Sequence, residues 1–121
     1  QVIAMLARQD ARAFLVYTPD HAENLWDDER ERILHGFATR VEFEIPLVVW
    51  ASKLFVDQEP DKWAQLARNR DQPVSNENVL PTLLDAMGIV PLPGRSLLRD
   101  YVPADRVVSI DSLDVPFRLV Q

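Results

Sequence analysis

The chain has 121 residues, 47% of them hydrophobic and 26% charged, and these values fit one modest globular domain. Its formal net charge of −6 argues against nucleic-acid binding through a basic surface. Because the sequence has no cysteine, a disulfide framework and a thiolate metal site are both excluded. No apolar run approaches the roughly 20 residues that a membrane-spanning helix needs, and no signal-peptide pattern is present.

The first residues show the apolar spacing of a helix. Hydrophobic side chains recur at helical intervals over residues 2–7, and Gln9-Asp10 ends the pattern. The first residue is Gln1 rather than Met, and it lies at the edge of this pattern. We therefore expect residues 1–121 to be a piece of a longer protein.

An apolar run over residues 13–17 ends abruptly in the polar segment Thr18-Pro19-Asp20-His21. The run does not alternate, which predicts a strand covered on both faces. In open α/β sheets, sites lie at the carboxyl ends of strands. Asp20 and His21 offer one oxygen and one imidazole nitrogen, a pair suited to zinc or manganese. Neighbouring side chains on a regular strand point to opposite faces, so Asp20 and His21 can bind one ion only where the strand has ended in a turn, and Pro19 favours such a turn. Taken alone, the Asp-His pair also fits two ordinary turn residues.

Two polar stretches follow. Residues 24–32 are dense in charge and predict either a solvated loop or a short helix with internal Glu/Arg pairs. His35 stands next to Gly36, and on its own it fits an ordinary loop histidine.

The middle of the chain predicts a second strand and a surface helix. Leu47 to Ala51 is apolar, and Pro46 fits the first residue of a strand because it lacks a ladder donor. We expect this strand to be buried beside residues 14–17 at the centre of a sheet. Pro60 fits the first position of an amphipathic helix.

Residues 79–87 carry the clearest helical pattern. Leu80, Leu83, Leu84 and Met87 follow the spacing i, i+3, i+4, i+7, and this stripe fits a core face better than a cofactor pocket. A cap at Asn78 leaves the proline at 81 in the first turn, whereas a cap at residue 75 would place it deep enough to clash. The glycine at 88 suits the position just after the helix.

The last part predicts a loop at 91–94, a helical turn at 96–101 and two strands at 106–110 and 115–120 with a turn at 111–112. Pro116 confines the final strand to an edge or to its own first residues. We find no internal repeat and no linker. The whole predicts one α/β unit, a sheet with helices packed on it.

These residues carry a resemblance to a known family. The segment Tyr17 to Leu25, with Asp20-His21 at its centre, resembles the "S-D-H-G-E" segment of the sulfatase-like branch of the alkaline phosphatase superfamily. The segments 34–36, 45–52 and 74–89 agree in order and spacing. Together, residues 1 to about 100 look most like the C-terminal part of the phosphoethanolamine transferases that decorate lipid A, core sugars or glucans. Ala22 and Asn24 depart from the glycine and serine that are usual there, which puts the turn geometry in doubt, and Pro81 stands where histidine is common.

The resemblance implies a partial alkaline-phosphatase-like fold and assigns roles. Asp20 and His21 match two zinc ligands, and His35 matches a histidine near the substrate phosphate. That histidine either donates a hydrogen bond to the phosphate or binds a second zinc; we expect the donor role, because no acidic or imidazole partner adjoins it in sequence. The nucleophilic threonine is expected upstream, so this fragment, 1–121, contains no catalytic residue and is expected to be inactive alone.

The same resemblance implies partners and a location. It predicts a phospholipid donor, phosphatidylethanolamine, a glycan or lipid acceptor, no nucleic acid, and a missing N-terminal catalytic half with a membrane anchor at the periplasmic face of a bacterial inner membrane. With only two ligands present, we expect weak or no zinc binding by the fragment, and self-association through the surface left open. A sulfatase or phosphodiesterase of the same superfamily, or a non-catalytic interaction domain, remains the alternative.

Overall fold

The computed structural model describes residues 1–26, 31–37, 39–91, 93–100, 107–110 and 113–118, the last two segments by their backbone pairing alone. The chain divides into two compact units. One comprises Gln1–Pro19 and Pro46–Pro103, and the other comprises Asp20–Ile45 and Ala104–Gln121. Each unit is considered separately below.

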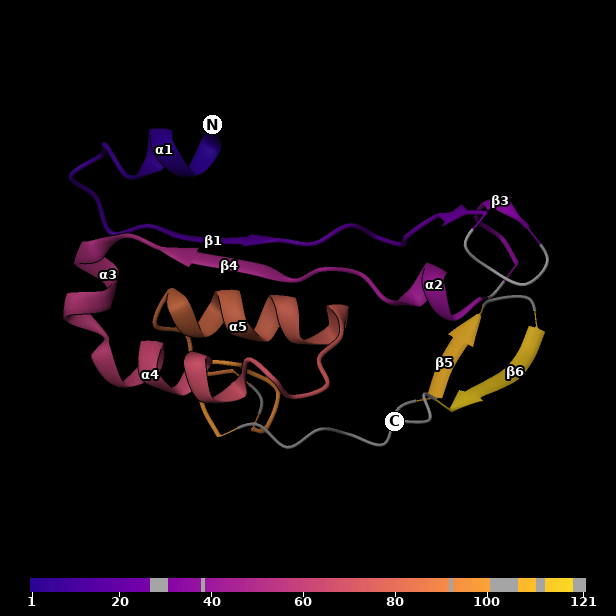
Figure 1. Ribbon diagram of the computed structural model, residues 1–121. Coiled ribbons are helices and arrows are strands. Elements are labelled where there is room, and N and C mark those ends of the chain that lie inside the picture. Colours follow the sequence, from indigo (N-terminus) through magenta and orange to yellow (C-terminus); the bar gives the residue numbers. More distant parts are fainter. Residues whose placement is uncertain (27–30, 38, 92, 101–106, 111–112, 119–121) are drawn as a thin grey trace. The chain divides into compact units, whose positions relative to one another are not determined.

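The first unit is built on a pair of strands, β1 (Phe14–Tyr17) and β4 (Val48–Ala51), which lie side by side in Figure 1. They pair antiparallel, with Phe14 opposite Ala51 and Tyr17 opposite Val48. The prediction that these two strands are neighbours is confirmed, but among the described residues they form a sheet of two strands, so neither is central. Their expected burial holds only at the Ala51 end, because Tyr17 and Val48 are exposed at the other end.

Two helices follow β4, and residues at their first positions explain where each helix begins. The Ser52 hydroxyl caps α3 (Lys53–Gln58) by accepting the backbone N–H of Phe55 at 3.2 Å. The sequence did not suggest this short helix. The next helix, α4 (Pro60–Asn69), begins at its proline as predicted, since the missing N–H costs nothing at the first helical position.

The predicted helix over 79–87 is present as α5 (Val79–Ala86). It follows a 3₁₀ turn, η1 (Asn76–Asn78), and Asn78 stands at its N-cap position, which leaves Pro81 in the first turn. The Asn78 side chain accepts the backbone N–H of Ser75 instead of capping α5. At the other end of α5, Gly88 has a φ of +84°, a backbone conformation that glycine adopts without strain. Its N–H donates to the Asp85 carbonyl.

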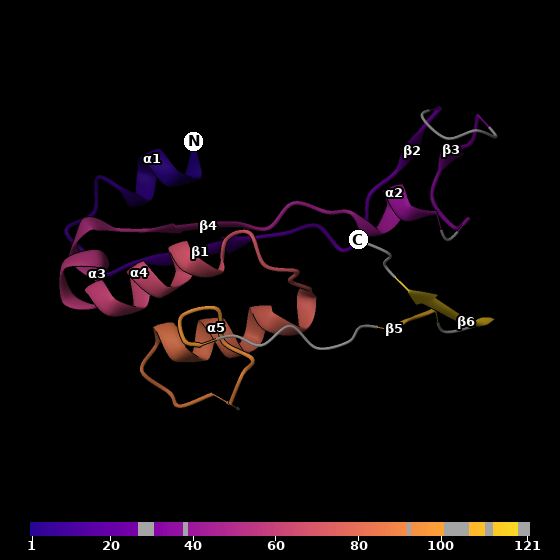
Figure 2. The same cartoon turned by 60° about the horizontal axis from the view of Figure 1, so that its bottom comes forward.

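The core of this unit joins the sheet to the helices. Ala51, Phe55, Ala86 and Leu98 form a buried cluster, and Phe14 packs against it. The rings of Phe14 and Phe55 lie 5.0 Å apart in a tilted arrangement. Strand β1, helix α3 and helix α5 therefore share one apolar core, and the α/β class predicted from sequence is confirmed (Figure 2).

A buried carboxylate ties α5 to the loop that follows it. Asp85 is fully buried, and it accepts hydrogen bonds from Ser96 Oγ at 2.8 Å and from Arg99 Nε at 2.7 Å and Nη2 at 2.9 Å. Lys62 Nζ of α4 lies 3.3 Å from the same carboxylate. Residues 97–98 form a turn here, and Tyr101 lies outside the described residues.

The remaining helix of the first unit is α1 (Val2–Leu6), none of whose residues is buried. The second unit contains β2 (Asn24–Leu25), β3 (Ile33–Leu34), α2 (Arg40–Phe43), β5 (Val107–Ile110) and β6 (Leu113–Arg118). Strands β2 and β3 pair antiparallel, and so do β5 and β6. Within the described ranges, no helix has the length and apolar character needed to cross a membrane.

Two of these findings bear on the sequence predictions. The charged stretch 24–32, expected to be a loop or a helix, instead begins with strand β2, and β3 starts just after it at Ile33. The two C-terminal strands are confirmed as a pair, with Pro116 inside β6. The turn predicted at 111–112 and the strand ends predicted at 106 and 119–120 lie outside the described residues.

Candidate functional site

The small β2–β3 ladder brings together two segments of the second unit that carry polar side chains. Asn24 pairs with Leu34 across the ladder. Residues 20–23 lead into β2, and residues 35–37 leave β3, so both segments meet at one end of the ladder. This pairing explains how His21 and His35, fourteen positions apart in the sequence, become neighbours.

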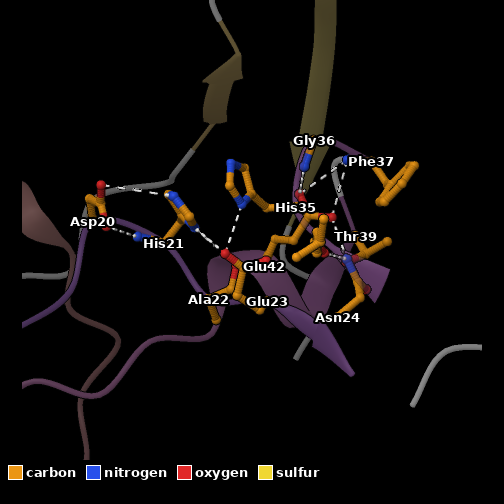
Figure 3. Close-up of polar contacts among 11 residues, drawn as sticks. Asp20, His21, Ala22, Glu23, Asn24, His35, Gly36, Phe37, Thr39 and Glu42 are labelled. Carbon is orange, nitrogen blue, oxygen red and sulfur yellow. Dashed lines mark hydrogen bonds and ion pairs between the residues drawn. The ribbon is translucent and has the colours of Figure 1, made fainter. Parts of the chain in front are cut away.

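The two histidines and Glu23 form one cluster, and Figure 3 draws a dashed line from each ring to the Glu23 carboxylate. His35 Nδ1 lies 2.8 Å from Glu23 Oε1, and His21 Nδ1 lies 3.9 Å from the same oxygen. The two imidazole rings are 4.0 Å apart between centroids. One ligand atom from each of the three residues can be chosen so that all lie within 4.8 Å of one another.

The hydrogen bonds of the rings define their tautomers in this state. An ionised carboxylate only accepts, so His35 donates its Nδ1–H to Glu23 and leaves Nε2 for another partner. The Ala22 carbonyl lies 3.1 Å from His21 Nδ1 and likewise only accepts, so this nitrogen carries a hydrogen too. Carbonyl and carboxylate partners of this kind are typical of histidines that bind metal through their other nitrogen.

Glu23 has one carboxylate oxygen that pairs with none of the residues that the structure describes. Its Oε2 is buried and makes no hydrogen bond among the described residues. Burial of an unpaired carboxylate oxygen is costly, because the oxygen loses its water without gaining a donor. Two imidazoles and a carboxylate are a donor set that suits a divalent cation of the zinc type. The residues present therefore fit such an ion.

Asp20 lies at the rim of this cluster. Its Oδ1 accepts the backbone N–H of His21 at 3.1 Å, and its Oδ2 lies 3.9 Å from His21 Nε2. The side chain is 90% exposed. The structure thus brings the three residues singled out from sequence, Asp20, His21 and His35, into one neighbourhood, with Asp20 the most open to solvent.

Glu42 of α2 fastens both segments of the site. Its buried carboxylate accepts the backbone N–H groups of Gly36 and Phe37, each at 3.1 Å. Its own carbonyl accepts the N–H of Ala22 at 2.9 Å. One residue therefore holds the backbone beside His21 and the backbone beside His35.

Asn24 adds side-chain bonds to the same scaffold. It is fully buried, and its Nδ2 donates to the Leu34 carbonyl at 2.9 Å and to Glu42 Oε1 at 2.6 Å. Its Oδ1 accepts the Thr39 hydroxyl at 2.8 Å. The serine that is usual in the motif that this segment resembles would have no amide group with which to make these contacts together, so the asparagine at this position has a structural role.

The other departure, Ala22, causes no backbone strain. Positive φ angles among non-glycine residues of the described chain occur at Trp26, Glu31 and Leu34, and not at Ala22. Glycine is needed instead at Gly36, where φ is +101°. That angle turns the chain directly after His35, which explains why a glycine follows this histidine.

Sequence reasoning missed Glu23 and Glu42. Glu23 stands two residues after His21 in the acidic end of the motif, and that position was its only signal. Glu42 belongs to a stretch that alternates apolar and acidic residues, which gave no hint that this one acid is buried. The expected donor role of His35 rested on the lack of acidic and imidazole residues next to it in sequence; in the structure Glu23 and His21 lie beside it.

The comparisons with known proteins identify the family. A model of the sulfatase family matches residues 1–89, which is most of the chain and includes the whole Asp20 to Gly36 region. Neither a curated protein nor a solved structure matches the chain. The match runs through β1, the histidine cluster, β4 and α5, the same parts that form the described core and site. On this match, the chain belongs to the sulfatase family.

Proposed function

We propose that this chain is the C-terminal part of a zinc-dependent phosphoethanolamine transferase of the sulfatase family. The complete enzyme would move phosphoethanolamine from phosphatidylethanolamine to a lipid A, core-sugar or glucan acceptor. The observation that supports this proposal is the family match over residues 1–89 together with the gathering of Asp20, His21 and His35 at one place.

The chemistry assigns each of these residues a task. Asp20 and His21 would hold zinc, with the remaining ligands supplied by the rest of the enzyme. Zinc, when bound, lowers the pKa of a hydroxyl nucleophile and neutralises charge on the phosphoryl oxygens. His35, which is hydrogen-bonded to Glu23 and lies next to His21, would serve the phosphate group of the substrate.

Partners and location follow from the same proposal. The donor would be a phospholipid and the acceptor a glycan or lipid, and a membrane anchor elsewhere in the protein would keep the enzyme at the periplasmic face of a bacterial inner membrane. The net charge of −6 supports a role without nucleic acid.

The test is a transfer assay on the complete protein. The enzyme, supplied with phosphatidylethanolamine and lipid A, should add one phosphoethanolamine group, seen by mass spectrometry. Asp20→Ala and His21→Ala should each abolish the added mass, because each change removes a proposed metal ligand. Normal transfer in either variant would contradict the metal assignment.

A hydrolase is the second candidate, since the matching family model is that of the sulfatases. The same residues would then serve attack by water on a sulfate or phosphate ester. Hydrolysis of an aryl sulfate or of a phosphodiester, without transfer to lipid A, would favour this candidate over the transferase.

A further inference from the structure

We infer that the exposed apolar surface around the β2–β3 ladder binds the hydrocarbon chains of a zwitterionic phospholipid whose phosphate lies at the histidine cluster. We call this region the ladder surface, and it consists of five exposed apolar residues: Leu25, Trp26, Ile33, Leu34 and Phe37. The inference rests on the proposed function, which makes a phospholipid the donor, and it adds the place where the apolar part of that donor binds.

Apolar side chains are exposed here as a group. Three of the four residues in β2 and β3, the strand pair labelled in Figure 2, are apolar and exposed, and the fourth is the buried Asn24. Leu25 and Trp26 are 75% and 65% exposed, and Leu34 is 63% exposed. A single exposed leucine is ordinary, whereas a group of exposed apolar residues marks a surface that contacts another molecule.

Backbone strain accompanies the exposure of these side chains. Successive side chains of a regular strand point to opposite faces, so one residue in each of the pairs 25–26 and 33–34 should face inward. Instead all four are exposed, and the second residue of each pair has a positive φ, +64° at Trp26 and +73° at Leu34. This conformation is unfavourable for a bulky side chain. Unfavourable backbone that persists in a fold is concentrated at sites that bind ligands.

Hydrogen bonds keep the strained residues in this conformation. The Trp26 N–H donates to the Arg32 carbonyl at 3.0 Å, and the Leu34 carbonyl accepts Asn24 Nδ2 at 2.9 Å. The guanidinium of Arg32 also lies over the Phe37 ring, 5.3 Å from its centroid. The apolar side chains are thus carried by a fixed backbone, which lowers the entropic cost of binding a ligand.

The ladder surface continues directly from the histidine cluster. Leu34 is followed by His35, and Leu25 stands two residues after Glu23. A ligand with its phosphate at the histidines would therefore extend its next atoms along the ladder. A phospholipid has this order of parts, because a short glycerol unit joins its phosphate to its hydrocarbon chains. The position beside the cluster thus favours a phospholipid over an unrelated protein partner.

The charge of the segment between the two strands favours a zwitterionic lipid. Residues 27–32 carry four acidic and two basic side chains, and the whole chain has a net charge of −6. Anionic lipid surfaces attract basic segments, so a segment with an excess of acidic side chains is repelled. A zwitterionic phospholipid has no net charge to cause this repulsion, and acidic side chains attract its ammonium group.

The first experiment mixes the purified chain with vesicles of phosphatidylcholine, a zwitterionic lipid, that carries bromine atoms on its hydrocarbon chains. Bromine quenches tryptophan fluorescence only at close contact, so quenching reports an indole ring among these chains. The sequence has three tryptophans. Quenching should largely disappear in Trp26→Phe, which keeps an aromatic ring, and should persist in Trp63→Phe, because Trp63 packs against the core of the first unit. Vesicles of phosphatidylglycerol, an anionic lipid, should give less quenching.

A matched pair of variants tests the ladder surface itself. Leu34→Gln should weaken vesicle binding by about 10-fold, because it removes an apolar contact. Leu80→Gln should leave vesicle binding unchanged, since Leu80 of α5 is 64% exposed but lies in the first unit.

Leu34→Asn separates loss of lipid contact from loss of the fold. Asparagine adopts a positive φ more readily than leucine does, so the unfolding free energy should not fall. Vesicle binding should nevertheless fall as in Leu34→Gln. Urea denaturation and the quenching assay measure the two quantities separately.

In the complete enzyme, the same pair of variants should differ in KM. Leu34→Gln should raise KM for phosphatidylethanolamine with long hydrocarbon chains about 10-fold more than KM for a short-chained, water-soluble form. Leu80→Gln should raise neither constant.

Several results would overturn the inference: no quenching, quenching kept in Trp26→Phe, stronger binding to phosphatidylglycerol, equal effects of Leu34→Gln and Leu80→Gln, or the same change in KM for both donors. Reduced self-association in Leu34→Gln with unchanged vesicle binding would assign the ladder surface to a second copy of the chain instead. Vesicle binding without transfer by the complete enzyme would overturn the proposed transferase alone. Transfer without vesicle binding would overturn this inference alone.

Discussion

At the scale of single residues, His35 has two chemical roles open to it. The proposed role is donation of a hydrogen bond to a substrate phosphate, whereas its neighbours Glu23 and His21 would also suit it to bind an ion. In the complete enzyme we expect His35→Ala to reduce transfer by about 100-fold, and His35→Gln, which keeps a donor, to retain part of the activity. Rates and metal content of both variants provide the check. Equal loss of transfer in both variants, with loss of bound zinc, would favour metal binding instead.

Glu42 is the residue that we expect to support the site without touching an ion. Glu42→Gln replaces one acceptor oxygen by a donor that faces the N–H groups of Gly36 and Phe37. The unfolding free energy should fall by about 2 kcal/mol, because hydrogen bonds to a buried charge are lost. Zinc affinity should fall by about 10-fold, as for other residues that orient metal ligands.

The control for this change is Glu44→Gln, two positions along the same segment. Glu44 pairs with Arg40 one turn earlier, and its side chain is 53% exposed. Exposed pairs of this kind contribute little. Urea denaturation and zinc titration should therefore leave this variant close to the unchanged chain, and equal effects in both variants would contradict a specific role for Glu42.

At the scale of elements, the attachment of α5 to the loop after it depends on Asp85. Burial alone raises the pKa of the Asp85 carboxyl, but hydrogen bonds from Arg99, Ser96 and Lys62 and the charge of Arg99 outweigh it, so the pKa lies below its ordinary value. A carboxyl with a lowered pKa stabilises the fold above its unfolded pKa, near 3.9, and this contribution is lost as the pH falls below about 4.

The test compares Asp85→Asn with the unchanged chain at two pH values. At pH 7 the variant should be less stable by about 3 kcal/mol, because it leaves a charged arginine beside a buried neutral amide. At pH 3 the difference should narrow, since the carboxyl of the unfolded chain then binds a proton that the folded carboxyl, with its lowered pKa, resists. Tryptophan fluorescence during urea denaturation measures both, and a constant difference at the two pH values would contradict the role of the charge.

At the scale of the whole chain, apolar side chains that face solvent predict self-association. Val2 and Met5 of α1 are 56% and 58% exposed, and Tyr17 at the end of β1 is 59% exposed. Exposed apolar groups of this kind favour contact with a second copy. Light scattering should show dimers or larger species as concentration rises, and fewer of them in Met5→Lys. A clean monomer at high concentration would contradict this expectation.

Local patterns were enough to predict much of the fold. Apolar periodicity located β1, β4 and α5, and proline and glycine chemistry fixed the start of α4 and the end of α5. The antiparallel pairing of β1 with β4 could not be predicted, because a continuous apolar run fits either direction. The β2–β3 ladder was missed for a different reason: two residues in each strand are too few to show a period.

The site was predictable only in part. The motif around Asp20 and the pair His35-Gly36 singled out residues that the structure places together. Glu23 and Glu42 required knowledge of the fold, because their importance comes from contacts across the β2–β3 ladder and with α2. A buried acid in a mostly polar stretch looks, in sequence, the same as an exposed one.

The bonds to Glu42 have a consequence for hydrogen exchange. The backbone N–H groups of three residues donate to Glu42, that of Ala22 to its carbonyl and those of Gly36 and Phe37 to its carboxylate. Ala22 lies far from the other two in sequence. Exchange with deuterium requires each of these bonds to open, and regions that open as a unit share one opening free energy. The three amides should therefore show similar protection from exchange. The backbone next to His21 and the backbone next to His35 should open in the same local unfolding event.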